Sequence, residues 1–256
     1  MITSEKLTYI ADNMPKVYEA GKTEGIVDGI KSEYDKFWDA YQENGTRRNY
    51  DYGFSYYGWY NENFKPKYNM IPTAMAYTFA YSNLSVNLVE LLDSLGVKLD
   101  TSNSVRFQYA FAVNNMTHLP KISTVSNTYG NGLDKTFIRA KFLQSIEELE
   151  LKSDGSQKFP NTFSECTSLT HIVITGTIGE DINFQDCPLS VDSMVSILSH
   201  LQNFNLTNLD KYGTQTVYFN DDCWSRLEAA QIETPIPEQY GTDWKSYLTD
   251  SIGWNY

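Results

Sequence analysis

Cysteine, basic segments and long apolar runs are all scarce in this sequence. Its three cysteines, Cys166, Cys187 and Cys223, are few and odd in number, which argues against a disulfide framework and for synthesis in a reducing compartment. No stretch approaches the roughly 20 consecutive apolar residues of a membrane helix, so we expect no membrane insertion. The opening MITSEKLTYI lacks a basic segment followed by an apolar one, so we expect no signal peptide.

Basic residues are also few compared with acidic ones. Lysine and arginine total 20 residues against 32 aspartates and glutamates, which gives a formal net charge of −12 at pH 7. A chain of this charge is repelled by nucleic-acid phosphates and by an anionic membrane surface, so we expect neither as a partner. The hydrophobic content of 41% suffices for a sizeable core, which excludes wholesale disorder.

Motifs that would predict catalysis or metal binding are missing. Gly21–Thr23 reads GKT, like the end of a phosphate-binding loop, but Lys16 stands where that motif has its first glycine. His118 and His171 occupy one position of an internal repeat, which supplies two ligands where zinc takes three or four. We therefore expect no catalytic residue, no metal and no cofactor.

The first forty residues predict helix. Their apolar positions step by three and four in two sets that differ in register. The first set is Leu7, Ile10, Met14 and Val17, and the second is Val27, Ile30, Tyr34, Phe37 and Tyr41. Pro15 and several glycines predict two pieces rather than one rod. Residues 1–43 are thus interpreted as an N-terminal helical segment, which either docks on the rest of the chain or joins copies of itself.

Residues 44–69 change in composition and are interpreted as an aromatic-rich linker or cap. They are rich in glycine, asparagine and aromatic residues, and they have no helical or strand periodicity. Tyrosine and tryptophan supply large, rigid contact areas with polar tips. The binding candidates are therefore Tyr56, Tyr57, Trp59 and Tyr60. The alternative is that some of these rings pack down as a cap.

An imperfect internal repeat decides the fold prediction. Its most regular copy, FSECTSLTHIVI, begins at Phe163. The other copies begin at Phe79, Phe111, Phe137 and Phe184. A unit this small buries its apolar residues only by stacking on its neighbours, with strands about 4.8 Å apart. We predict an α/β fold in which an irregular leucine-rich-repeat solenoid spans residues 70–190.

The end of the chain departs from the repeat. Ser190 is positioned to cap a helix that carries Met194, Ile197 and Leu198 on one face, and an extended TQTVYF and a second helix near Trp224–Ala230 follow. We interpret residues 191–256 as a mixed C-terminal cap, because the last unit of a stack needs an atypical cover.

Two of the cysteines recur in the repeat. Cys166 and Cys187 each lie three residues after a repeat phenylalanine, so stacking would place them one layer apart. That separation admits a disulfide. Two buried free thiols are the favoured interpretation, because Cys223 is left over.

The pattern FxxCxSLTxIxI at Phe163–Ile174 resembles the BspA-type leucine-rich-repeat proteins, a family of bacterial-surface and phage-borne proteins. The phrases MPKVYEAGK, EYDKFWDAYQENGTRRNY and LSVDSMVSIL resemble sequences found in repeat proteins of phages and prophages of Firmicutes. The resemblance implies a virion-associated protein that recognises a host surface, with the N-terminal helices attaching it to a particle or to sister subunits. It implies no catalytic residue.

We therefore predict a non-enzymatic binding protein whose partner is a protein or glycan on a host surface, with a possible homo-oligomer through the N-terminal helices. The expected location is the virion, or the bacterial cytoplasm before assembly. One alternative is a structural virion component without an outside ligand. Another is a glycan-cleaving tail enzyme, which would need two convergent carboxylates. Carboxylates are too plentiful for the sequence to single out a pair; examples are Glu147, Glu148, Asp181, Asp221 and Asp222.

Overall fold

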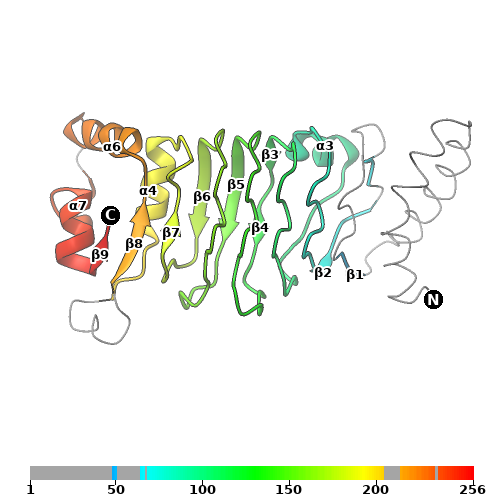
Figure 1. The fold of residues 1–256 in the computed structure, drawn as a ribbon, viewed down its shortest axis with the longest axis horizontal. Helices are drawn as coiled ribbons and strands as arrows, with labels where there is room; N and C mark the ends of the chain where they lie inside the picture. The colour runs from blue at the N-terminus through cyan, green and yellow to red at the C-terminus, as the bar shows by residue number, and fades with distance from the viewer. Residues whose placement is uncertain (1–47, 51–63, 67, 205–213, 234–235) are drawn as a thin grey trace, which may run out of the picture. The chain divides into compact units, whose positions relative to one another are not determined.

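The computed structural model of the chain describes residues 48–50, 64–66, 68–204, 214–233 and 236–256. The predicted N-terminal helices of residues 1–43 lie outside this part. The described residues fall within one compact unit, Arg47–Tyr256 (Figure 1). Its strands are β1 (Arg48–Asn49), β2 (Pro72–Ala74), β3 (His118–Leu119), β4 (Ile122–Ser123), β5 (Ser145–Glu150), β6 (His171–Thr175), β7 (Ile182–Asn183), β8 (Gln215–Tyr218) and β9 (Trp254–Asn255). Its helices are α3 (Leu88–Leu95), α4 (Val191–Ser199), α6 (Asp221–Glu233) and α7 (Trp244–Ser246), with a 3-10 turn η2 (Glu238–Tyr240) and a π-helical turn η3 (Tyr247–Ile252).

The strands of the described part pair in parallel and form three small sheets. Strand β1 pairs with β2. Strands β3 and β4 both pair with β5, and β5 pairs with β6. Strands β7, β8 and β9 form the third sheet in that order. In Figure 1 these strands lie side by side as the chain advances from β3 to β9.

The middle sheet has two irregularities, and the sequence explains one of them. Pro120 lies between β3 and β4 and has no N–H to donate, so it divides what would be one strand into two. In β5 the register shifts between Ile146 and Leu149, which face Ile172 and Ile174 of β6. Two residues of β5 therefore stand opposite one residue of β6, as in a β-bulge.

The strand pairing contradicts the α/β leucine-rich-repeat solenoid predicted for residues 70–190. Within the described residues the strands are divided among three separate small sheets instead of forming one continuous repeat sheet. The chain also places helix α3 within the predicted repeat region and helix α4 directly after it. The correct description is an α/β arrangement of small parallel sheets with interspersed helices.

Helix α4 is the physical reason that the middle sheet ends at β6. The N–H groups of Ile172 and Ile174 donate to the side-chain oxygens of Ser193 and Ser196, at 2.9 and 2.8 Å. These serine hydroxyls occupy the position in which a further strand would pair with β6. Strand β7 therefore pairs with β8 and not with β6.

The core of the unit contains a stack of phenylalanine rings. Successive ring centroids are 4.5–5.6 Å apart, within the range of favourable offset stacking. The stacked rings are Phe79, Phe111, Phe137, Phe163 and Phe184, and all are buried. The backbone joins the same layers, because the N–H of Phe111 donates to the carbonyl of Thr136 at 2.8 Å. The recurring phenylalanines are thus a shared core even though the strands do not share one sheet.

Residues on either side of four of these phenylalanines adopt left-handed backbone conformations. The positions lie two residues before and two residues after the ring, with φ between 49° and 60°. They are Tyr77 and Tyr81, Tyr109 and Val113, Lys135 and Arg139, and Asn161 and Glu165. This conformation costs roughly 1–2 kcal/mol for a residue with a Cβ. It directs backbone N–H groups to the next layer; the N–H of Tyr81, for example, donates to the carbonyl of Ala112 at 3.0 Å.

Candidate functional site

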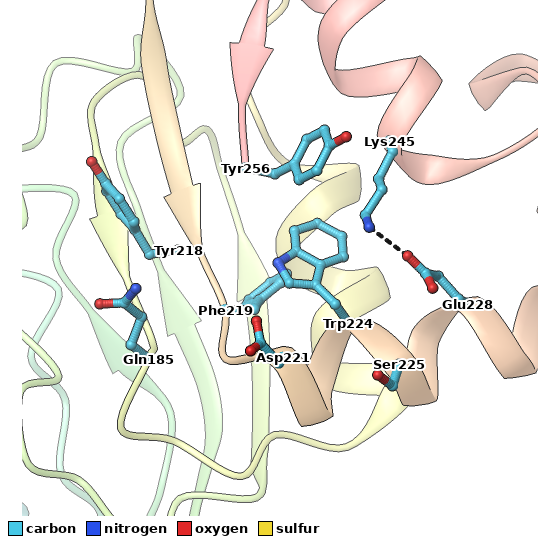
Figure 2. Close-up of a pocket in the computed structure, with 9 residues that line it drawn as sticks. All are labelled: Gln185, Tyr218, Phe219, Asp221, Trp224, Ser225, Glu228, Lys245 and Tyr256. Atoms are coloured by element: carbon cyan, nitrogen blue, oxygen red, sulfur yellow. Dashed lines mark ion pairs between the residues drawn. The ribbon is translucent and has the colours of Figure 1, made fainter.

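The predicted binding residues Tyr56, Tyr57, Trp59 and Tyr60 lie outside the described residues, so their role stays a prediction. The described part of the chain carries a different aromatic site, a hollow of about 650 Å³ formed by α6, the loop after β7, strand β8, α7 and the residue that follows β9 (Figure 2). Its lining residues are Gln185, Tyr218, Phe219, Asp221, Trp224, Ser225, Glu228, Lys245 and Tyr256.

Helix α6 supplies four of the lining residues from one face. Asp221, Trp224, Ser225 and Glu228 are spaced by three, four and seven residues, which brings them together on one side of a helix. Asn220 fixes the start of this helix, because its side-chain oxygen accepts the N–H of Cys223 at 2.8 Å. The same side chain donates to the carbonyl of Gln185 at 3.1 Å, which ties α6 to the loop after β7.

Three aromatic rings form the base of the hollow. Phe219 and Trp224 meet edge to face with centroids 5.1 Å apart, and Trp224 meets Tyr256 in the same way at 5.3 Å. Trp224 is 8% exposed, whereas Tyr256 is 49% exposed. Trp224 therefore backs the hollow, and Tyr256 presents an accessible ring beside it (Figure 2).

Strand pairing and helix capping place the remaining groups. Gln215 and Thr216 of β8 pair in parallel with Trp254 and Asn255 of β9. Tyr256 is the next residue along the chain, so this pairing fixes its position. Asp243 caps α7 by accepting the N–H of Ser246 at 2.8 Å, and this hydrogen bond lowers the pKa of the Asp243 carboxyl. The cap fixes the turn that carries Lys245.

The Lys245 ammonium is surrounded by two rings and a carboxylate. Its nitrogen lies 2.5 Å from a carboxylate oxygen of Glu228 (Figure 2). It also lies 5.5 Å from the ring centroid of Trp224 and 5.0 Å from that of Tyr256, within the range of cation–π attraction. The hydrogen bond to Glu228 is the main cause of the raised pKa of Lys245.

The rim of the hollow is polar and exposed. Gln185, Asp221 and Ser225 contribute an amide, a carboxylate and a hydroxyl. The accessible ring of Tyr256 beside such groups suits a ligand that has both an apolar face and hydroxyl or amino substituents. Chemically, the hollow is equipped to stack, accept hydrogen bonds and neutralise a positive charge.

A second hollow, of about 490 Å³, lies at the ends of β5 and β6 and has no aromatic lining residue. Nearby, Lys121 bridges Glu148 and Glu150 at 3.0 and 3.1 Å. Of the two carboxylates that line this hollow, Glu150 is paired with Lys121 and Asp154 accepts hydrogen bonds from Ser156. Because it also lacks aromatic rings, this region is the weaker candidate.

The two repeat histidines are not neighbours. His118 of β3 pairs with Ser145 of β5, and Ser145 pairs with His171 of β6, so one strand separates the two rings. Across the ranges that the structure describes, no group of three histidine, cysteine or acidic side chains is placed to hold a metal ion.

Sequence reasoning missed Trp224, Glu228, Lys245 and Tyr256 as site residues. The helical spacing of Trp224 and Glu228, in a helix that the sequence does predict, was a signal that could have grouped these two. No sequence spacing connects them with Lys245 and Tyr256, which reach the hollow through the packing of α7 and β9.

No family model, curated protein or solved structure matches the chain. Among the helices that the structure describes, none is long and apolar enough to cross a membrane.

Proposed function

We propose that the chain is a non-enzymatic binding protein that recognises a glycan on a host surface through the hollow around Trp224 and Tyr256. The observation that carries this proposal is the accessible ring of Tyr256, backed by the buried rings of Trp224 and Phe219, beside a polar rim. Sugars offer apolar C–H faces to aromatic rings, and they offer hydroxyl groups to amides and carboxylates. The hollow provides both kinds of contact within one small space.

A glycan fits this hollow better than a host-surface protein does. A stable protein partner buries about 800 Å² on each side, mostly on a broad surface. A hollow of about 650 Å³ is of the size that holds a small ligand or part of one. The resemblance of Phe163–Ile174 to BspA-type proteins supports a further part of the proposal. The protein is carried on a virion, and its residues 1–43 attach it to the particle.

Binding without cleavage is favoured by the state of Glu228. A glycosidase needs one carboxyl group that donates a proton and a second that acts as nucleophile or base. In this hollow Glu228 is instead ion-paired with the Lys245 ammonium at 2.5 Å, so the site does not present two free carboxyl groups. We therefore expect no reducing ends to be released when the full chain is incubated with host-wall polysaccharides. Release that a single carboxylate substitution abolishes would establish the enzyme alternative.

The experiment that tests the proposal is binding of the full chain to purified host-wall polysaccharides, measured by calorimetry. Tyr256→Ala should weaken binding by about 10-fold or more, the loss that is typical of removing a central aromatic contact. Tyr81→Ala is the matched control, because Tyr81 has a similar exposure of 41% and does not line the hollow. Equal affinities of the wild type and Tyr256→Ala would reject the hollow as the binding site.

A further inference from the structure

The hollow already holds a positively charged nitrogen in the free protein. The Lys245 ammonium is bound by one carboxylate and lies over the faces of two rings, and this combination is the one that recognises ammonium groups of ligands. Lys245 comes from α7, whereas Glu228 and Trp224 belong to α6. The cage is thus formed by α6 and Tyr256, and a side chain from a separate helix fills it.

We propose that the hollow binds the amino group of its ligand, and that Lys245 holds the place of that group until the ligand arrives. The inference deepens the proposed function and rests on it for the nature of the ligand. The ligand class is a glycan with unsubstituted amino groups, such as a polymer of amino sugars that lack N-acetyl groups.

The charge of the protein and of the hollow favours a cationic ligand. The chain carries a net charge of −12, which attracts cations at long range. Asp221 adds a second carboxylate to the lining, two helical turns from Glu228. Displacement of Lys245 would leave the Glu228 carboxylate facing the ligand, so a neutral sugar would leave this charge uncompensated.

The site that the Lys245 ammonium occupies is exposed enough for the lysine to leave it. The side chain of Lys245 is 36% exposed and that of Glu228 is 51% exposed. Ion pairs with this much exposure contribute little to stability, because water solvates the separated charges well. A ligand ammonium can therefore exchange with Lys245 at small cost, and the released lysine keeps its charge in solvent.

A primary ammonium fits better than a quaternary one. The contact between Lys245 and Glu228 is a hydrogen bond in which an ammonium N–H donates to the carboxylate. A quaternary ammonium has no N–H and forfeits this hydrogen bond. An amino sugar reproduces it and also offers a ring face to Tyr256.

The test compares two oligosaccharides of β-1,4-linked glucosamine of equal length, one with free amino groups and one fully N-acetylated. Calorimetry with the full chain should give at least about 10-fold tighter binding of the free-amine oligomer, the effect expected of a single charged hydrogen bond. Glu228→Gln should remove this preference, and Lys245→Met should strengthen binding of the free-amine oligomer. Each variant is first shown to unfold at the temperature of the wild type.

Glu147→Gln is the matched control, since Glu147 is an exposed carboxylate outside the hollow and its loss changes the net charge equally. An equal loss of binding in Glu147→Gln and Glu228→Gln would overturn the inference in favour of general charge attraction. Weaker binding by Lys245→Met would overturn it in favour of a structural link between the two helices. Equal binding of the two oligomers would also overturn it and would leave the proposed glycan function standing.

A second measurement follows Lys245 itself. NMR of protein labelled with 13C-lysine follows the ε-methylene group of Lys245, whose chemical shift should move away from the ring-shielded position when the free-amine oligomer is added and should stay unchanged with the N-acetylated oligomer. An unchanged shift at a concentration of the free-amine oligomer that saturates binding would overturn the inference. If neither oligomer binds, the inference is rejected, and the wall-polysaccharide experiment with Tyr256→Ala decides the proposed function separately.

Discussion

The packing of Phe163 illustrates how a single residue stabilises the core. Its ring lies between those of Phe137 and Phe184, with centroids 5.4 and 4.5 Å away, and it is 1% exposed. Phe163→Ala should lower the free energy of unfolding by about 3–5 kcal/mol, because the substitution leaves a cavity in the stack. Urea unfolding of the variant measures this loss.

Phe142 provides the control for that experiment. It is 57% exposed, so Phe142→Ala should change the free energy of unfolding by no more than about 0.5 kcal/mol. A loss below about 1 kcal/mol in Phe163→Ala would show that the ring stack contributes little.

The cysteines follow the favoured prediction of buried free thiols. Cys166 and Cys187 are free and buried, and the Cys166 thiol donates to the carbonyl of Phe137 at 3.0 Å. Burial raises the pKa of Cys166 to about 12. The stability that comes from keeping this thiol neutral is present below its ordinary value of 9.0 and is lost as the pH rises toward 12.

Both thiols should therefore resist alkylation in the folded protein. Iodoacetamide at pH 8 should leave Cys166 and Cys187 unmodified for as long as the protein stays folded, and it should modify both in denaturant, since the thiolate is the reactive form. Mass spectrometry gives the extent at each position. Rapid modification of Cys166 in the native state would contradict the buried placement.

At the level of secondary-structure elements, the serine hydroxyls of α4 end the middle sheet at β6. Ser193→Ala leaves the buried N–H of Ile172 without its acceptor, and this should cost about 1–3 kcal/mol of unfolding free energy. Ser199→Ala is the matched control, since the Ser199 hydroxyl donates to Val195 within the same helix. Chemical denaturation of the two variants should separate them, and equal stabilities would remove the role assigned to Ser193.

Local signals predicted individual elements well. Ser190 accepts the N–H of Ser193 at 3.3 Å and caps α4, as its position predicts, and Met194 and Ile197 on the expected face are buried. The helix near Trp224 is present as α6. Caps and amphipathic faces depend on residues a few positions apart, so the sequence displays them directly.

Sheet organisation was not predictable in the same way. The repeat pattern marks which side chains are buried, but it does not say whether the neighbour of a strand is another strand or a helix. Ser193 and Ser196 replace a strand at the edge of β6, and nothing distinguishes these serines from ordinary helical serines before the chain is folded. The solenoid prediction failed at this point.

At the level of the whole molecule, the role of residues 1–43 in oligomerisation stays a prediction, since they lie outside the described residues. If these residues join sister subunits, the full chain should form a defined oligomer, and a chain that lacks them should be monomeric and still folded. Light scattering of the two proteins at equal concentration measures this. Two monomers would favour docking of the segment on its own chain, and an unfolded shortened protein would contradict the independence of the unit Arg47–Tyr256.

The residues with left-handed backbone conformations beside the stacked phenylalanines indicate where the sequence of this protein can vary. One structurally equivalent site accepts tyrosine, lysine and asparagine at Tyr77, Lys135 and Asn161, and the other accepts valine and glutamate at Val113 and Glu165. The left-handed conformation favours asparagine and disfavours a β-branched residue such as valine, yet both occur at these positions, because the hydrogen bonds between layers hold the backbone in place. The outer edge of the layers is consequently a row of interchangeable positions, where surface chemistry can diversify while the ring stack beneath stays the same.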